Sequence, residues 1–110
     1  AEVVDGTWVP RPELDARIVT VLSVRISASD KLYLLDFAMH GFMGVPKMVV
    51  FQLGASRQHD RFLYQYEFPK AVAGKGSMLN DFNMNHDESS LFIADTSLVA
   101  GVPALLACSI

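Results

Sequence analysis

The chain lacks the sequence features that are typical of several protein classes. It has one cysteine, Cys108, so no intrachain disulfide can form and a disulfide-stapled miniprotein is excluded. Its 9 basic residues are outnumbered by 12 acidic ones and form no stripe, so we expect no nucleic-acid partner. No apolar stretch approaches the roughly 20 residues that a membrane-spanning helix needs, so we expect no membrane span. A net charge of −3 with 51% hydrophobic residues also excludes intrinsic disorder.

Helical periodicity is missing as well. No stretch of 11 or more residues repeats apolar side chains at helical spacing. The chain instead contains short apolar or alternating runs, separated by polar clusters such as Ser27–Asp30 and His86–Ser90. This pattern predicts an all-β protein. The predicted strands cover residues 19–26, 32–35, 47–53, 61–68, 81–85, 91–94 and 104–108.

One strand–turn–strand unit occurs twice. Val24–Ser27 leads through a polar turn to Leu32–Asp36. Phe82–Asn85 then leads through a similar turn to Leu91–Asp95, and the two closing aspartates lie 59 residues apart. Two further predicted strands lie between the copies. Four strands per period is the layout of a β-propeller blade.

The chain is too short for a complete propeller. About four to eight blades are needed to close the ring, and 110 residues at 59 residues per period supply fewer than two. We therefore predict that residues 1–110 are a fragment of a β-propeller domain, with blade repeats at about 22–68 and 80–110. The remaining blades would lie on the same or another chain. A self-contained β-sandwich or barrel with a coincidental repeat is the alternative.

Several motifs follow one another in the order found in one protein family. Val24–Asp36 is similar to V-R-I-D-x-x-G-R-L-W-V-L-D, and Pro46–Leu53 is similar to P-K-L-V-V-F-D-L. Tyr66–Pro69 matches Y-x-F-P, while Ser77–Asp81 and Leu91–Thr96 match S-x-L-N-D and Y-I-A-D-S/T. In these elements the chain resembles the Yellow / major royal jelly protein family over about residues 8–97. It looks closest to bacterial-type members labelled dopachrome-tautomerase-related.

This resemblance implies a fold and a function. Members are six-bladed propellers, so the chain would be about the first third of one. They are linked with dopachrome conversion, a tautomerase-like isomerisation, or with binding of small amines and sterols, and most are secreted or periplasmic. The chain departs from the family at Phe37–Met39, where many members continue Asp-Thr-Gly, and at Gln52, where Asp is common. The first departure leaves open whether the protein is an enzyme.

The pair Asn80-Asp81 is a candidate ligand or metal site. In related calcium-dependent propellers of the gluconolactonase and regucalcin type, an Asn-Asp pair starts an inner strand and its Asn holds the metal. That resemblance implies Asn80 as a calcium ligand and Asp81 as a residue that braces it or bonds backbone. Calcium takes six to eight oxygen ligands, which inner strands of several blades can share. The plain alternative is that the pair shapes the turn into the strand.

The Gly-containing segment Met39–Gly44 follows the strand that ends at Asp36 and contains another candidate site residue. We interpret His40 as lining the mouth of a ligand site, because binding residues are common on such loops. A flexible connector is the alternative. His59 and His86 lie in polar turns and show no metal-ligand spacing with His40 or Cys108, so we expect them to be solvated.

Four more residues are given structural roles. Asp36 and Asp95 end equivalent strands and are predicted to cap the following turns through backbone N–H groups, since a unique site needs no duplicated residue. Cys108 lies in an apolar run and is expected to pack rather than react. Trp8 is expected to cover the side of a blade.

Three functions follow from these observations. The first is a small-molecule-binding propeller with Asn80, Asp81 and His40 at the ligand. The second is a calcium-dependent lactonase or esterase of the gluconolactonase type, in which calcium polarises a carbonyl and activates water. The third is a structural subunit of a larger assembly.

Overall fold

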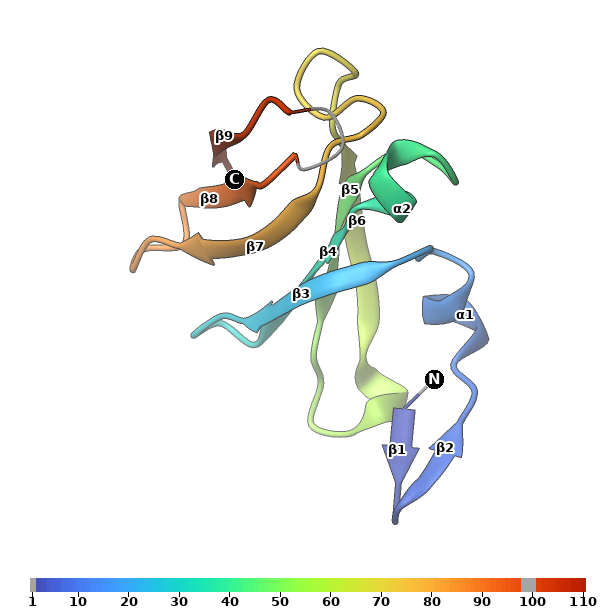
Figure 1. The fold of residues 1–110 in the computed structure, drawn as a ribbon. Helices are drawn as coiled ribbons and strands as arrows, with labels where there is room; N and C mark the ends of the chain where they lie inside the picture. Colours follow the sequence, from blue (N-terminus) through green and yellow to red (C-terminus); the bar gives the residue numbers. More distant parts are fainter. Residues whose placement is uncertain (1, 98–100) are drawn as a thin grey trace.

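The computed structural model describes residues 2–97 and 101–110, which form three antiparallel sheets (Figure 1). Residues 98–100, inside the second predicted repeat, lie outside the described residues. A four-stranded sheet has the order β3-β4-β5-β6 and a three-stranded sheet the order β7-β8-β9. The strands of these two sheets are β3 (Val21–Ile26), β4 (Lys31–Asp36), β5 (Lys47–Gln52), β6 (Arg61–Glu67), β7 (Leu79–Met84), β8 (Ser90–Asp95) and β9 (Ala104–Ser109).

The remaining elements are short. β1 (Glu2–Val4) and β2 (Thr7–Val9) form a separate hairpin. The helical turns are α1 (Pro12–Asp15), α2 (Ala38–Gly41) and the 3₁₀ turn η1 (Arg57–His59). None of the helices in the described part of the chain is long and apolar enough to cross a membrane.

The all-β prediction is confirmed, and every predicted strand overlaps an observed one. No sheet among the described residues closes on itself. The hairpin β1–β2 was not predicted, and it overturns the role expected for Trp8. This side chain lies on a hairpin that projects from the two larger sheets, and it is exposed to solvent (Figure 1).

The continuous apolar runs of β4 and β5 are explained by burial on both faces. Tyr33 and Leu35 point towards the β7–β9 sheet and belong to the main buried cluster. Leu34 points the other way and belongs to a second cluster, which Leu14 and Ile18 cover from the segment around α1. In β7, in contrast, Leu79 and Phe82 are buried, whereas the polar Asn80, Asp81 and Asn83 are exposed.

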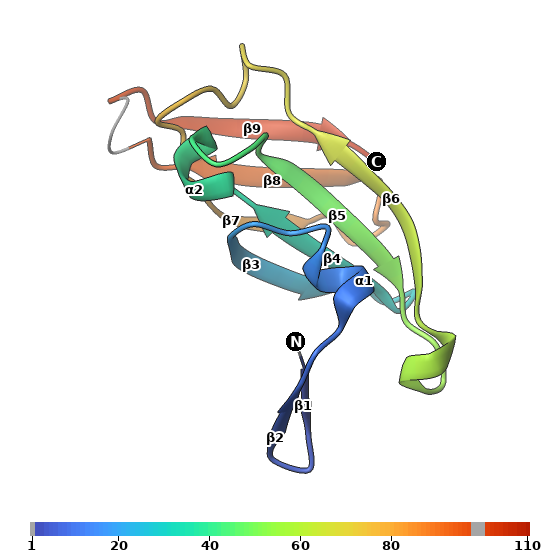
Figure 2. The same ribbon diagram turned by 90° about the vertical axis from the view of Figure 1, so that its right-hand side faces the viewer.

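The two larger sheets pack against each other through β3, β4 and β7. Figures 1 and 2 show β3 and β7 side by side. We call the faces that meet the inner faces and the opposite ones the outer faces. The inner face of the β3–β6 sheet carries Tyr33, Leu35, Met48 and Val50, and that of the β7–β9 sheet carries Leu79, Phe82, Leu91 and Ile93.

Asp36 caps the start of the β3–β6 sheet. Its carboxylate accepts hydrogen bonds from the backbone N–H groups of Val19 (2.7 Å), Thr20 (2.9 Å) and Ala38 (2.9 Å). The Lys47 ammonium lies 3.4 Å from the same carboxylate, which is fully buried. These hydrogen bonds and the Lys47 ammonium compensate the buried Asp36 carboxylate for its lost hydration.

Asp95 plays the same part in the β7–β9 sheet. Its Oδ1 accepts from the backbone N–H groups of Met78 and Ser97, both at 2.9 Å. Met78 precedes β7 as Thr20 precedes β3, so the hydrogen bonds repeat with the sequence. The structural role predicted for both aspartates is therefore confirmed.

The repeat extends to an irregularity in the first strand of each sheet. The β3–β4 register shifts at Leu22, and the β7–β8 register shifts at Asn80. Each of these residues is the extra residue of a β-bulge, which re-aims side chains and increases local twist. The two sheets are thus copies of one unit in pairing, bulge and cap.

Candidate functional site

The turn α2 is the most strained segment of the described chain. Ala38, Met39, His40 and Gly41 have φ values of +49°, +50°, +59° and +73°, so four successive residues are left-handed. Only Gly41 adopts this conformation without a steric cost, and each of the others costs about 1–2 kcal/mol. Strain of this kind persists where the surroundings hold it and gathers at ligand-binding sites.

Hydrogen bonds hold the turn in place. The N–H of Gly41 donates to the Phe37 carbonyl at 3.0 Å, and that of Met43 donates to the Ala38 carbonyl at 3.1 Å. The carbonyl of His40 accepts from the N–H of Gly76 at 2.8 Å, which ties the turn to the segment before β7. The segment predicted as a loop therefore forms a hydrogen-bonded turn.

His40 itself has an unused polar atom. Its ring stands edge-on to Phe37, with the ring centroids 4.9 Å apart. Its Nδ1 is buried and has no hydrogen-bond partner among the described residues. A buried polar atom without a partner costs free energy that a hydrogen-bonding ligand would recover.

Asp81 joins the two sheets. Its Oδ1 accepts hydrogen bonds from the Ser23 hydroxyl and from the Arg25 guanidinium, the latter at 2.9 Å. The N–H of Phe82 also donates to this oxygen, at 2.8 Å. Asp81 therefore bonds backbone, as one of the predicted roles required, but its side-chain partners lie on β3 and do not include Asn80.

These contacts change the acidity of Asp81. The Ser23 hydroxyl, followed by the Phe82 N–H and Arg25, holds the pKa of Asp81 below its usual range. A second carboxylate bridges the sheets nearby, since the N–H and hydroxyl of Ser29 both donate to Glu88. The Ser29 hydroxyl likewise lowers the pKa of Glu88. Both carboxylates thus remain ionised while they hold the sheets together.

Asn80 is exposed at the bulge of β7. The equivalent position in β3 is Leu22, so the bulge is repeated but the amide side chain is not. A residue that serves one ligand site need not be repeated, so the absence of a second Asn fits such a role. Asp36 and Asp95, in contrast, are repeated because both cap a sheet. The calcium role proposed for Asn80 needs further oxygen ligands. In the described residues no group of three or more His, Cys, Asp or Glu side chains is placed to hold a metal ion.

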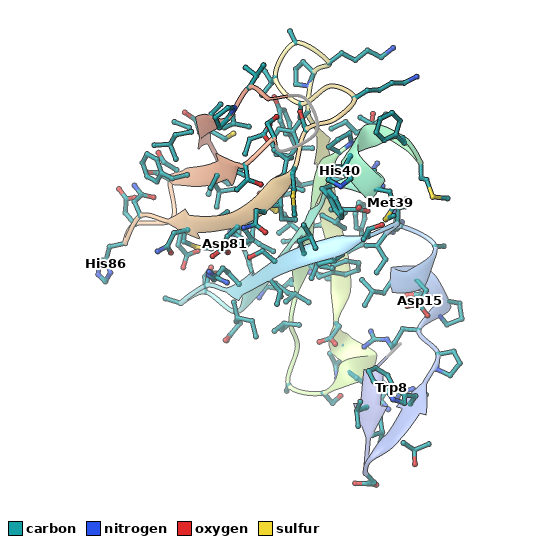
Figure 3. All side chains as sticks on the ribbon, viewed as in Figure 1. Trp8, Asp15, Met39, His40, Asp81 and His86 are labelled. Carbon is teal, nitrogen blue, oxygen red and sulfur yellow. The ribbon has the colours of Figure 1, made fainter. Side chains whose placement is uncertain are left out.

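The three candidate residues lie on two elements, His40 on α2 and both Asn80 and Asp81 on β7. Figure 3 shows His40 on α2 and Asp81 on β7, beside β3. Within the described part of the chain no hydrogen bond joins either of them to the other or to Asn80. His40 and Asn80 are related through the segment before β7, whose Gly76 bonds the His40 carbonyl. His59 and His86 are exposed, as predicted.

A groove that the sequence did not reveal lies between β6 and β9. It has a volume of about 610 Å³ and is lined from one side by Tyr64 and Tyr66 and from the other by Leu106 and Cys108. Burial raises the pKa of the Cys108 thiol, which agrees with the expectation that this residue packs rather than reacts. In the sequence, the alternating aromatic residues of β6 were a signal for this groove. The sequence did not show which surface lies opposite them.

One side of this groove is a free strand edge. In the β3–β6 sheet β5 pairs with β6, whereas within residues 2–97 and 101–110 no strand pairs with the free edge of β9, which corresponds to β5. Beside the groove, burial and the neighbouring phenol of Tyr64 raise the pKa of Tyr33 to about 12. The Tyr33 phenol beside the groove therefore stays neutral near neutral pH.

Comparisons of the chain with protein-family models, with curated proteins and with solved structures give no match. The functional argument accordingly rests on the residues and their geometry.

Proposed function

We propose that the chain is part of a six-bladed β-propeller of the Yellow / major royal jelly protein type, which binds a small molecule near the α2 turn. The observation that carries this proposal is the strained turn itself. Three non-glycine residues are held left-handed there, and they present a buried His40 Nδ1 that has no hydrogen-bond partner in the part of the chain that the structure describes. Strain and an unused hydrogen-bonding atom at one place are typical of a ligand contact.

The architecture supports the proposal in two ways. The two larger sheets share the same cap and the same bulge, which suits successive blades of one ring. In such a ring β3 and β7 would be inner strands, and the bulged Asn80 would lie at the end of β7 that adjoins α2 through Gly76. We leave the catalytic residues unassigned, and the secreted or periplasmic location follows only from the family resemblance.

The first test is the intact mass of the natural protein together with its state of association. A ring needs more blades than a 12.1 kDa chain supplies. A longer polypeptide, or several copies in one particle, is the expected result. A natural protein of this mass that folds as a monomer would overturn the ring.

The second test is ligand binding by the natural protein. We expect at least one compound from a panel of small aromatic amines and sterols to raise its Tm. His40→Ala should weaken that binding by about tenfold, the worth of one hydrogen bond. The matched control is His59→Ala, because His59 is an exposed histidine away from α2, and it should bind as the wild type does.

The same experiment distinguishes the alternatives. A panel without any binder would remove the small-molecule function. Stabilisation by calcium that is lost in Asn80→Ala would replace it with the calcium-dependent lactonase or esterase.

A further inference from the structure

The two carboxylates that cap the larger sheets differ in their partners. Both oxygens of Asp36 are occupied: Oδ1 accepts two backbone N–H groups, and Oδ2 accepts the N–H of Val19 at 2.7 Å and lies 3.4 Å from the Lys47 ammonium. In Asp95 the two backbone N–H groups also donate to Oδ1. Within the described residues, however, Asp95 Oδ2 has neither a hydrogen bond nor an ion pair, although the residue is only 4% exposed.

The strand register explains the missing cation. Asp36 is paired with Lys47 at the start of β5, and Asp95 is paired with Ala104 at the start of β9. The position that carries an ammonium group in the first sheet therefore carries a methyl group in the second.

The backbone donor to Oδ2 is also missing from the second sheet. Ser77, which directly precedes the capping donor Met78, holds the place of Val19. The N–H of Ser77 donates to the Gly74 carbonyl at 3.2 Å and is not directed at Asp95. Asp95 Oδ2 thus lacks both partners of its counterpart.

A cavity of about 380 Å³ is lined by both Asp95 and Ala104. Ser77 and Ser97 line it as well, and they are only 6% and 2% exposed. Their hydroxyl groups have no hydrogen-bond partner in residues 2–97 and 101–110. The cavity therefore offers one carboxylate oxygen and two hydroxyl oxygens as acceptors. Its volume lies within the range of about 300–1,000 Å³ that is typical of small-molecule sites.

We propose that this cavity, the Asp95 pocket, binds the primary ammonium group of a small aliphatic amine. The ammonium group takes the place that Lys47 fills at Asp36. Its three N–H donors match Asp95 Oδ2 and the hydroxyl oxygens of Ser77 and Ser97. A carboxylate oxygen withdrawn from water gains most from a charged donor. The hydrocarbon stem of the amine contacts the apolar lining residues Val72, Val102 and Leu106.

Other cations match the pocket less closely. A divalent metal ion needs several oxygen ligands, most of them charged or carbonyl oxygens. In the described part of the chain no group of three or more His, Cys, Asp or Glu side chains could supply them. Lys75 also lines the pocket, but its side chain is exposed and forms no ion pair with Asp95 within the described residues. The proposal depends neither on His40 nor on the ring.

The probe is n-butylamine, because it reproduces a lysine side chain from Cβ to Nζ and is protonated at neutral pH. We expect it to raise the Tm of the natural full-length protein in a saturable way at constant ionic strength. n-Butanol lacks the charge and tetramethylammonium lacks the N–H donors, so neither should raise the Tm. This ligand series needs no variant.

Ala104→Lys supplies the ammonium group from the chain itself. It leaves Asp95 in place, so the cap is retained. The variant should have a higher Tm without ligand and should bind n-butylamine more than about tenfold more weakly. The matched control Ala104→Met fills the pocket without a charge and should raise the Tm less. Ala55→Lys adds the same charge at an exposed position outside the pocket and should bind as the wild type does.

Several outcomes would overturn the proposal. These are the absence of a saturable response to n-butylamine, an unchanged response in Ala104→Lys, and equal stabilisation by Ala104→Met and Ala104→Lys. Binding that occurs only in Lys75→Met would mean that the chain's own lysine occupies the pocket. Stabilisation by calcium in place of n-butylamine would assign the pocket to a metal ion.

The pocket and the ligand function proposed above can fail separately. A protein that binds n-butylamine but no compound of the aromatic amine and sterol panel would lose only the proposed ligand function. A protein that binds a panel compound through His40 but does not respond to n-butylamine would lose only the Asp95 pocket.

Discussion

At the scale of single residues, the left-handed turn is where the chain departs furthest from backbone preference. Alanine and methionine avoid positive φ, and of Ala38, Met39 and His40 only His40 belongs to a residue type that is enriched there. Their conformation is imposed by the hydrogen bonds around the turn and by the approach of Gly41 to Gly74. A Cβ on Gly41 would lie 3.1 Å from the Gly74 carbonyl oxygen. The sequence could show a glycine there but not the strain that precedes it.

Met39→Gly is expected to stabilise the protein by about 0.5–1 kcal/mol. Glycine relieves about 1–2 kcal/mol of left-handed strain and costs about 0.5–1 kcal/mol in backbone entropy. Met39 is 44% exposed and belongs to neither buried cluster, so the loss of packing is small. Urea unfolding measures the change.

Gly41→Ala is the matched control for this prediction. It places a Cβ at positive φ and against the Gly74 carbonyl, so it should destabilise the protein. If Met39→Gly left the stability unchanged or lower, the turn would not be strained in solution.

Asp81 should make the stability depend on pH below about 4. Its folded pKa lies below the ordinary value of 3.8, which the unfolded chain retains. The carboxylate's contribution is therefore fully present above the unfolded pKa and is lost as the pH falls through the lower folded value. The variant Asp81→Asn lacks this contribution at every pH. Its deficit relative to the wild type should be constant above about pH 5 and shrink towards about pH 3.

Urea midpoints of the wild type and Asp81→Asn across this range measure the effect. The difference between the two proteins cancels the titration of other carboxyl groups, including Glu88. A gap that did not change with pH would mean that the ionised carboxylate does not hold β3 to β7.

At the scale of elements, the capping aspartates set the ends of the two repeated units. We expect Asp36→Ala to cost more stability than Asp95→Ala. The first removes three backbone acceptor contacts and leaves Lys47, whose side chain is 12% exposed, without its partner, a loss of about 3–5 kcal/mol. The second removes two backbone contacts and, among the described residues, no ion pair, a loss of about 1–3 kcal/mol. Equal losses in denaturant unfolding, or the reverse order, would contradict this ranking.

The strands of the two larger sheets could be predicted because their patterns are local. Continuous apolar runs gave the doubly buried strands β4 and β5, and alternation gave β7, since each pattern follows directly from which faces are covered. The hairpin β1–β2 was missed because its strands have three residues each, too few for a pattern. The turn α2 was missed because its shape depends on the distant Gly74–Gly76 segment.

At the scale of the whole molecule, the candidate site was only partly accessible from the sequence. The sequence identified His40 and Asp81 as polar residues at the ends or turns of strands. It could not show that Asp81 bonds Ser23 and Arg25, because that contact depends on how the two sheets stack. The repeated strand–turn–strand pattern did predict two copies of one unit, and the shared bulges at Leu22 and Asn80 and the shared caps at Asp36 and Asp95 follow that repeat.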